Sequence, residues 1–134
     1  TFDKRLKSAT ERQAFDLGRI ARLRVWYNNH SQFEAPSELN RIEREVEEVS
    51  DKLYSSMSLI AQGGYKRAFE LIEESEEILL DIEAVLALEE IQVIDQQNQE
   101  IDEAVKSMKE AEASSEDNFR DSAKEGDIIS PDTE

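Results

Sequence analysis

The segment from Leu39 to Ile60 carries the feature that most constrains the fold. Its apolar residues recur at steps of three and four, a heptad pattern interrupted once by two consecutive four-residue steps. They are Leu39, Ile42, Val46, Val49, Leu53, Met57 and Ile60. Side chains at this spacing share one face of an α-helix, because the helix turns once in 3.6 residues. A helix with one apolar face must pack on other helices, so this segment predicts a helical bundle or coiled coil.

Turn-forming residues bound this helix on both sides. Ser37 precedes the apolar pattern, and its hydroxyl is suited to accept a hydrogen bond from the first turn, so we expect it to be the N-cap of a helix over 38–62. Gly63 and Gly64 follow, and glycine ends helices because it adopts the left-handed C-cap conformation without strain. So short a connection favours an antiparallel neighbour.

Two further helices are expected, one before Ser37 and one after Gly64. Residues 2–29 place apolar side chains mostly three or four positions apart, and residues 65–113 contain no glycine or proline. The later segment carries two apolar stripes, which implies two packing partners. Four glycines and two prolines are too few to turn the many strands of an all-β protein. We therefore predict an all-α fold, an elongated antiparallel bundle or coiled coil of about three long helices.

The last residues have a different composition from the predicted bundle. Residues 114–134 are acidic, rich in serine and nearly devoid of apolar side chains. A segment of this kind cannot bury enough apolar surface to offset its loss of conformational entropy. We expect a helical bundle over 1–113 followed by a disordered acidic tail over 114–134.

Charge is distributed unevenly along the chain, whose net charge is −16. Residues 1–30 hold seven basic and three acidic side chains, a net +4, whereas the remaining residues carry a net −20. The nearest acidic surface for the basic segment belongs to the same protein, so we favour pairing within the molecule or between copies of it. A nucleic acid is not an expected partner, because the excess negative charge repels phosphate.

The basic segment nevertheless supplies candidate partner-binding residues, namely Arg19, Arg22 and Trp26. Basic side chains beside aromatic ones are typical of helices that bind an anionic membrane surface or a nucleic acid. This is the alternative function that the sequence leaves open. The interpretation we favour is that these arginines pair with glutamates of the third helix while Trp26 closes the end of the bundle.

The far part of the third helix supplies the other candidate partner-binding residues. Ile94, Ile101, Val105 and Met108 resume the apolar pattern beyond the point that two shorter helices could cover. Exposed apolar side chains in such a row favour burial against another chain. We therefore expect a homo-oligomer, most simply a dimer, or a complex with partner helices, and a non-enzymatic structural or interaction function.

A group of glutamates over residues 73–77 is the strongest candidate for a catalytic or metal-binding site. Glu73, Glu74 and Glu77 lie on neighbouring faces of one helical turn and could share a divalent cation. The spacing resembles the E-E-x-x-E element of the MazG type of all-α nucleoside triphosphate pyrophosphohydrolases, a resemblance that implies a magnesium-dependent enzyme as a third function. That family adds E-x-x-D on a following helix, whereas this chain offers Glu100 and Glu103 on the same helix. We favour a solvated surface, and expect no catalytic residue, metal or cofactor.

Other chemistry has little basis in the sequence. The chain has no cysteine, and its single histidine, His30, falls in a predicted turn. No run of about 18 apolar residues is present, so we expect a cytoplasmic protein. The chain begins with Thr1 rather than Met, which suggests a processed chain or a fragment. A membrane surface stays open as a partner if the chain belongs to an anchored protein.

Overall fold

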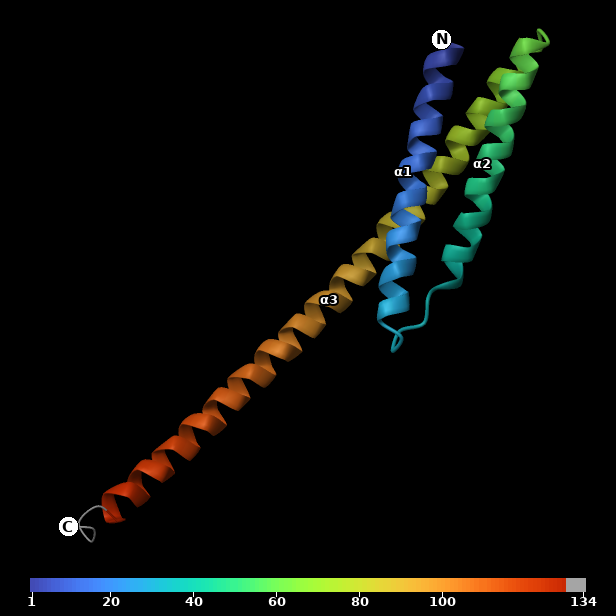
Figure 1. Cartoon of the computed structure of the whole chain (residues 1–134). Coiled ribbons are helices and arrows are strands. Elements are labelled where there is room, and N and C mark those ends of the chain that lie inside the picture. The colour runs from blue at the N-terminus through green and yellow to red at the C-terminus, as the bar shows by residue number, and fades with distance from the viewer. Residues whose placement is uncertain (130–134) are drawn as a thin grey trace. The chain divides into compact units, whose positions relative to one another are not determined.

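The computed structural model describes the backbone of residues 1–129 and the side chains of residues 1–115. Three helices follow one another: α1 (Phe2–Asn29), α2 (Ser37–Ala61) and α3 (Tyr65–Ile129), with no strand in the described backbone (Figure 1). The all-α prediction is confirmed. The chain divides into two compact units, unit 1 over Thr1–Val93 and unit 2 over Ile94–Glu134. Unit 1 holds α1, α2 and the first part of α3, and the described part of unit 2 is α3 alone.

Local signals explain where α1 begins and ends. The Thr1 hydroxyl accepts a hydrogen bond from the amide of Lys4 at 3.4 Å, and Asp3 lies in the first turn, where a negative charge favours the helix dipole. At the other end, His30 is the C-cap, and its Nδ1 lies 2.8 Å from the carbonyl oxygen of Trp26. The predicted bounds of 2–29 are confirmed, and His30 lies directly after the helix, where the sequence predicts a turn.

The N-cap predicted for α2 is wrong by one residue. Pro36 is the N-cap, with φ −62° and ψ 144°, and Ser37 is already the first helical residue. The proline ring fixes φ near −65°, a value that suits both the extended N-cap and the helix, so the chain enters the helix without a side-chain cap. No side chain makes a capping hydrogen bond at this end of α2.

The C-terminal end of α2 follows the glycine prediction. Gly63 has φ +84°, its amide donates to the carbonyl of Ile60 at 3.1 Å, and the amide of Gly64 donates to Leu59 at 2.7 Å. These two bonds form a Schellman motif, which satisfies the last carbonyls of a helix. The chain then reverses, and α3 begins at Tyr65, as predicted.

Helix α3 differs in length from the prediction, because it continues to Ile129 rather than ending at 113. Between Tyr65 and Gly126 the sequence has no glycine or proline that would interrupt the helix. The side chains of the predicted tail lie outside the described residues from position 116 onward, and its backbone does so beyond 129.

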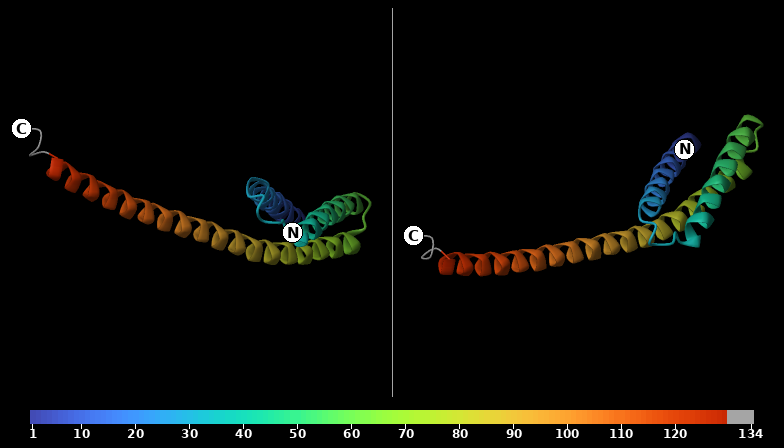
Figure 2. Two further views of the ribbon diagram at one scale, coloured as in Figure 1. Left: turned by 90° about the horizontal axis from the view of Figure 1, so that it is seen from below. Right: turned by 60° about the horizontal axis from the view of Figure 1, so that its bottom comes forward.

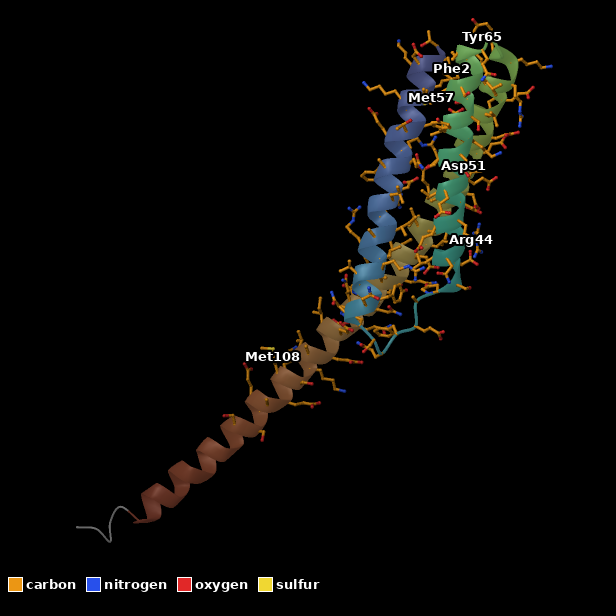
Figure 3. All side chains as sticks on the ribbon, turned by 45° about the vertical axis from the view of Figure 1, so that its right-hand side comes forward. Phe2, Arg44, Asp51, Met57, Tyr65 and Met108 are labelled. Atoms are coloured by element: carbon orange, nitrogen blue, oxygen red, sulfur yellow. The ribbon has the colours of Figure 1, made fainter. Side chains whose placement is uncertain are left out.

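Within unit 1 the three helices pack as a bundle, with α2 antiparallel to α1 and to the first part of α3. Figure 2 shows α1 and α2 beside the first part of α3. Arginines at 5, 12 and 19 pair in ascending order with glutamates at 76, 83 and 90, so α1 and α3 run in the same direction. Figure 3 agrees, because Phe2 and Tyr65 lie at the same end of unit 1.

Helices α2 and α3 each bury one row of side chains at uninterrupted steps of three and four, and the buried residues of α1 follow a similar spacing apart from a gap of seven between Ala9 and Asp16. On α2 the fully buried row includes Ser56 in place of the predicted Met57, which is 51% exposed. The row on α3 includes Ser75 and Glu89, and the row on α1 includes Asp16. Together with the apolar core residues, these polar side chains complete heptads that an apolar pattern alone leaves broken.

Candidate interaction surfaces

A ladder of ion pairs joins α1 to α3. Three arginines of α1 pair with three glutamates of α3, the partners being separated by 71 residues each time: Arg5 with Glu76, Arg12 with Glu83 and Arg19 with Glu90. The Arg12 pair is bidentate, with nitrogen to oxygen distances of 2.6 and 3.2 Å. Successive ion pairs are seven residues apart on both helices. This is the heptad interval, after which two packed helices present the same faces to each other again. The basic segment therefore meets acidic groups of its own chain.

Other ion pairs tie α2 to both neighbours. Lys52 donates to Glu74 of α3 at 3.0 Å, and Arg41 donates to Asp81 of α3 at 2.7 Å. Arg24 of α1 pairs with Glu43 of α2 at 2.6 Å. Partly exposed pairs of this kind contribute little stability one at a time, but they specify which faces of the helices meet.

The three candidate residues of the basic segment have different surroundings. Arg19 bonds to Glu90 and lies 3.7 Å from Asp16, and its side chain is 17% exposed. Trp26 is buried and stacks on His30, with ring centroids 4.2 Å apart, and on Phe33 at 5.6 Å. Arg22 is exposed. The structure thus places two of the three in contacts within unit 1, with Trp26 at the C-terminal end of α1.

Asp16 is a charged residue buried between the rungs of the ladder. It is 0% exposed, and neither carboxylate oxygen has a hydrogen-bond partner among the described residues. Burial, and then the neighbouring carboxyl group of Glu83, raise the pKa of Asp16 to about 7. The guanidinium groups of Arg19 and Arg12 oppose this rise without cancelling it. At neutral pH the protonated and ionised forms of the Asp16 carboxyl group therefore have similar populations.

The four candidate residues of unit 2 lie together on one face of α3. Ile94, Ile101, Val105 and Met108 are 53%, 59%, 43% and 65% exposed. At 3.6 residues per turn, steps of seven, four and three keep them within an arc of about 60°. Figure 3 shows Met108 on the stretch of α3 that belongs to unit 2. The sequence therefore correctly predicts both the shared face and its exposure.

Three other large apolar side chains of α3 are exposed within unit 1, and two of them, Leu88 and Ile91, belong to the second apolar stripe for which a packing partner is expected. Leu80, Leu88 and Ile91 are 62%, 64% and 55% exposed. Leu80 and Ile91 belong to a row with the alanines at 84 and 87, again at steps of four and three. That spacing is the signal that could have identified Leu80, and it is obscured because the buried row of α3 has the same period.

The acidic cluster of α3 is engaged in ion pairing. Glu74 accepts hydrogen bonds from Lys52 at 3.0 Å and from Arg67 at 3.3 Å, and these cations lower its pKa. Glu73 and Glu77 are exposed. In the part of the chain that the structure describes, no group of three or more histidine, aspartate or glutamate residues is arranged to hold a metal ion.

One open groove lies between α1 and α2. Its volume is about 370 Å³, and Leu17, Ile20, Ala21 and Val46 contribute to its lining. Arg24 and Glu43, which pair with each other, and Glu47 and Ser50 complete it. Its lining therefore combines apolar side chains with charged and polar ones.

Over the described residues, no helix combines the length and hydropathy needed to cross a bilayer. Comparison of the chain with protein-family models, with curated proteins and with solved structures finds no match.

Proposed function

We propose that this chain is a non-enzymatic interaction module that associates with a second copy of itself through the exposed apolar face of α3 in unit 2. The observation that carries the proposal is the row of Ile94, Ile101, Val105 and Met108, each more than 40% exposed on one helix face. Burial of apolar surface stabilises association by about 25 cal/mol per Å². A helix that carries such a row is best stabilised by another helix.

The charge pattern supports a protein partner over an anionic one. Arginines at 5, 12 and 19 are already paired with glutamates of α3, and Arg24 is paired with Glu43. A membrane surface or nucleic acid would have to compete with these carboxylates for the same guanidinium groups. The alternative of a basic binding helix therefore rests on the exposed Lys4, Lys7 and Arg22.

The test is the mass in solution of the double variant I101K/V105K. Two lysine charges placed in a buried apolar row would face each other across the interface, so we expect the variant to be a monomer that keeps the helicity of unit 1. The matched control is Q99K/S107K, which adds the same charge on the opposite side of the same helix. Equal masses for the two variants and the unmodified chain would contradict the proposal.

A further inference from the structure

A polar residue interrupts the exposed row of unit 2. Asn98 lies between Ile94 and Ile101, and it completes steps of four, three, four and three from Ile94 to Met108. We call these five residues, Ile94, Asn98, Ile101, Val105 and Met108, the unit 2 seam. All five side chains are exposed. In heptad notation Asn98 and Val105 occupy a positions, and Ile94, Ile101 and Met108 occupy d positions.

The amide of Asn98 restricts what can cover the unit 2 seam. An apolar helix laid on this face would remove the amide from water without giving it a hydrogen-bond partner. An asparagine side chain both donates and accepts, so a second asparagine can satisfy it. The occupant that matches the seam best is one that presents an asparagine at the same layer and apolar residues at the others.

A second copy meets this condition in only one direction. In a parallel, in-register pair each a residue faces the same a residue, so Asn98 faces Asn98. In an antiparallel pair a residues face d residues, and the d residues of the unit 2 seam are all apolar. The parallel pair also brings the amide of Gln97, at a g position, near the carboxylate of Asp102, at the e position of the second copy.

We propose that the unit 2 seam forms a parallel, in-register coiled coil with a second copy of this chain, and that an Asn98 to Asn98 contact fixes its direction and register. This inference rests on the proposed function, which supplies self-association but leaves orientation open. A single buried asparagine at an a position specifies register and the two-stranded state at some expense of affinity.

Direction is tested by disulfide formation in single-cysteine variants of the full chain, which has no cysteine of its own. In the parallel pair the two thiols of M108C lie at one layer, so air oxidation should yield a covalent dimer. In an antiparallel pair with Asn98 opposite Met108, the thiols would be about 15 Å apart and could not join. The control S107C carries its thiol on the outer face and should remain reduced.

The role of Asn98 is tested by combining M108C with N98V. Valine at this layer should tighten association by roughly tenfold, while the yield of the disulfide falls because other directions and registers become accessible. Q99V places valine at the next position along the helix, which does not face the unit 2 seam. It should change neither the affinity nor the disulfide yield. Unchanged disulfide yield in N98V/M108C would overturn the assignment of register to Asn98.

These outcomes separate this inference from the proposed function. If the unmodified chain is a dimer and M108C gives no disulfide, the parallel arrangement is overturned while self-association stands. If the unmodified chain is a monomer, both are overturned. A covalent dimer of M108C that depends on Asn98 supports both.

Discussion

Asp16 shows how a single residue can make the stability of unit 1 depend on pH. Its side chain is fully buried, and the nearest cation is the Arg19 guanidinium at 3.7 Å. Removing a carboxylate from water is unfavourable unless strong partners replace the lost hydration. The raised pKa of about 7 expresses that imbalance, because the neutral form is easier to bury than the charged one.

The sign of the effect follows from proton binding. The pKa of Asp16 rises from 3.8 to about 7 on folding, so between these values the folded chain holds a proton that the unfolded chain has released. Unfolding then releases a proton, and the contribution of Asp16 to stability falls as pH rises through this window. The loss is complete above about pH 7.

The variant D16N removes this titration while it keeps the shape of the side chain. We expect D16N to gain stability relative to the unmodified chain between pH 5 and pH 8, by about 1 kcal/mol or more at pH 8. Urea unfolding followed by circular dichroism at several pH values measures this difference. A difference that stays constant from pH 5 to pH 8 would show that Asp16 is ionised throughout.

Gly18 and Gly63 give opposite predictions for the same substitution. A Cβ added at Gly18, inside α1, would meet Nη1 of Arg22 at 3.6 Å, an ordinary contact. Alanine has a higher helix propensity than glycine, so G18A should stabilise unit 1 by about 0.5–1 kcal/mol. Gly63 has φ +84°, where a Cβ is strained, so G63A should destabilise it by about 1 kcal/mol. Thermal melts of both variants test the assignment, and a stabilised G63A would contradict the capping geometry.

At the scale of the helix, the apolar pattern predicted the three elements and most of the core but not its polar members. Step-counting from Leu53 selects Met57, yet Ser56 is the buried residue, and its hydroxyl donates to the carbonyl of Leu53 at 2.7 Å. Ser75 does the same toward Leu71 at 2.9 Å. A buried serine satisfies itself on its own helix, so nothing in its polarity marks it as a core residue. Completing the three-and-four rhythm through polar residues would have found both.

A pair of aspartate variants tests this correction on α2. Leu53 is 4% exposed and Met57 is 51% exposed. L53D would bury an unpaired carboxylate and leave a cavity, so we expect a loss of more than about 3 kcal/mol, enough to unfold unit 1. M57D should change the stability by less than about 1 kcal/mol. Similar losses in the two variants, measured by urea unfolding, would restore Met57 to the core.

At the scale of the whole chain, charge and apolar surface are used in different ways along its length. In unit 1 the basic residues of α1 are matched to acidic residues of α3 at intervals of seven. The uneven charge of the sequence predicted this pairing, but not its regular register, which depends on how the helices pack. In unit 2 the sequence predicted the exposed face, because a lone helix keeps every residue where its own period places it. The sequence pattern did not identify Asn98, because a search for apolar residues at steps of three and four passes over a polar residue in the same row.

Self-association is the central claim, and sedimentation equilibrium of the unmodified chain tests it most directly. A concentration series from low to high micromolar should show a mass that rises from the 15.4 kDa of one chain toward twice that value. The rise should be absent in I101K/V105K and present in Q99K/S107K. A mass that stays at that of one chain at high micromolar concentration would contradict the account, and the apolar face of unit 2 would then have to serve a different protein.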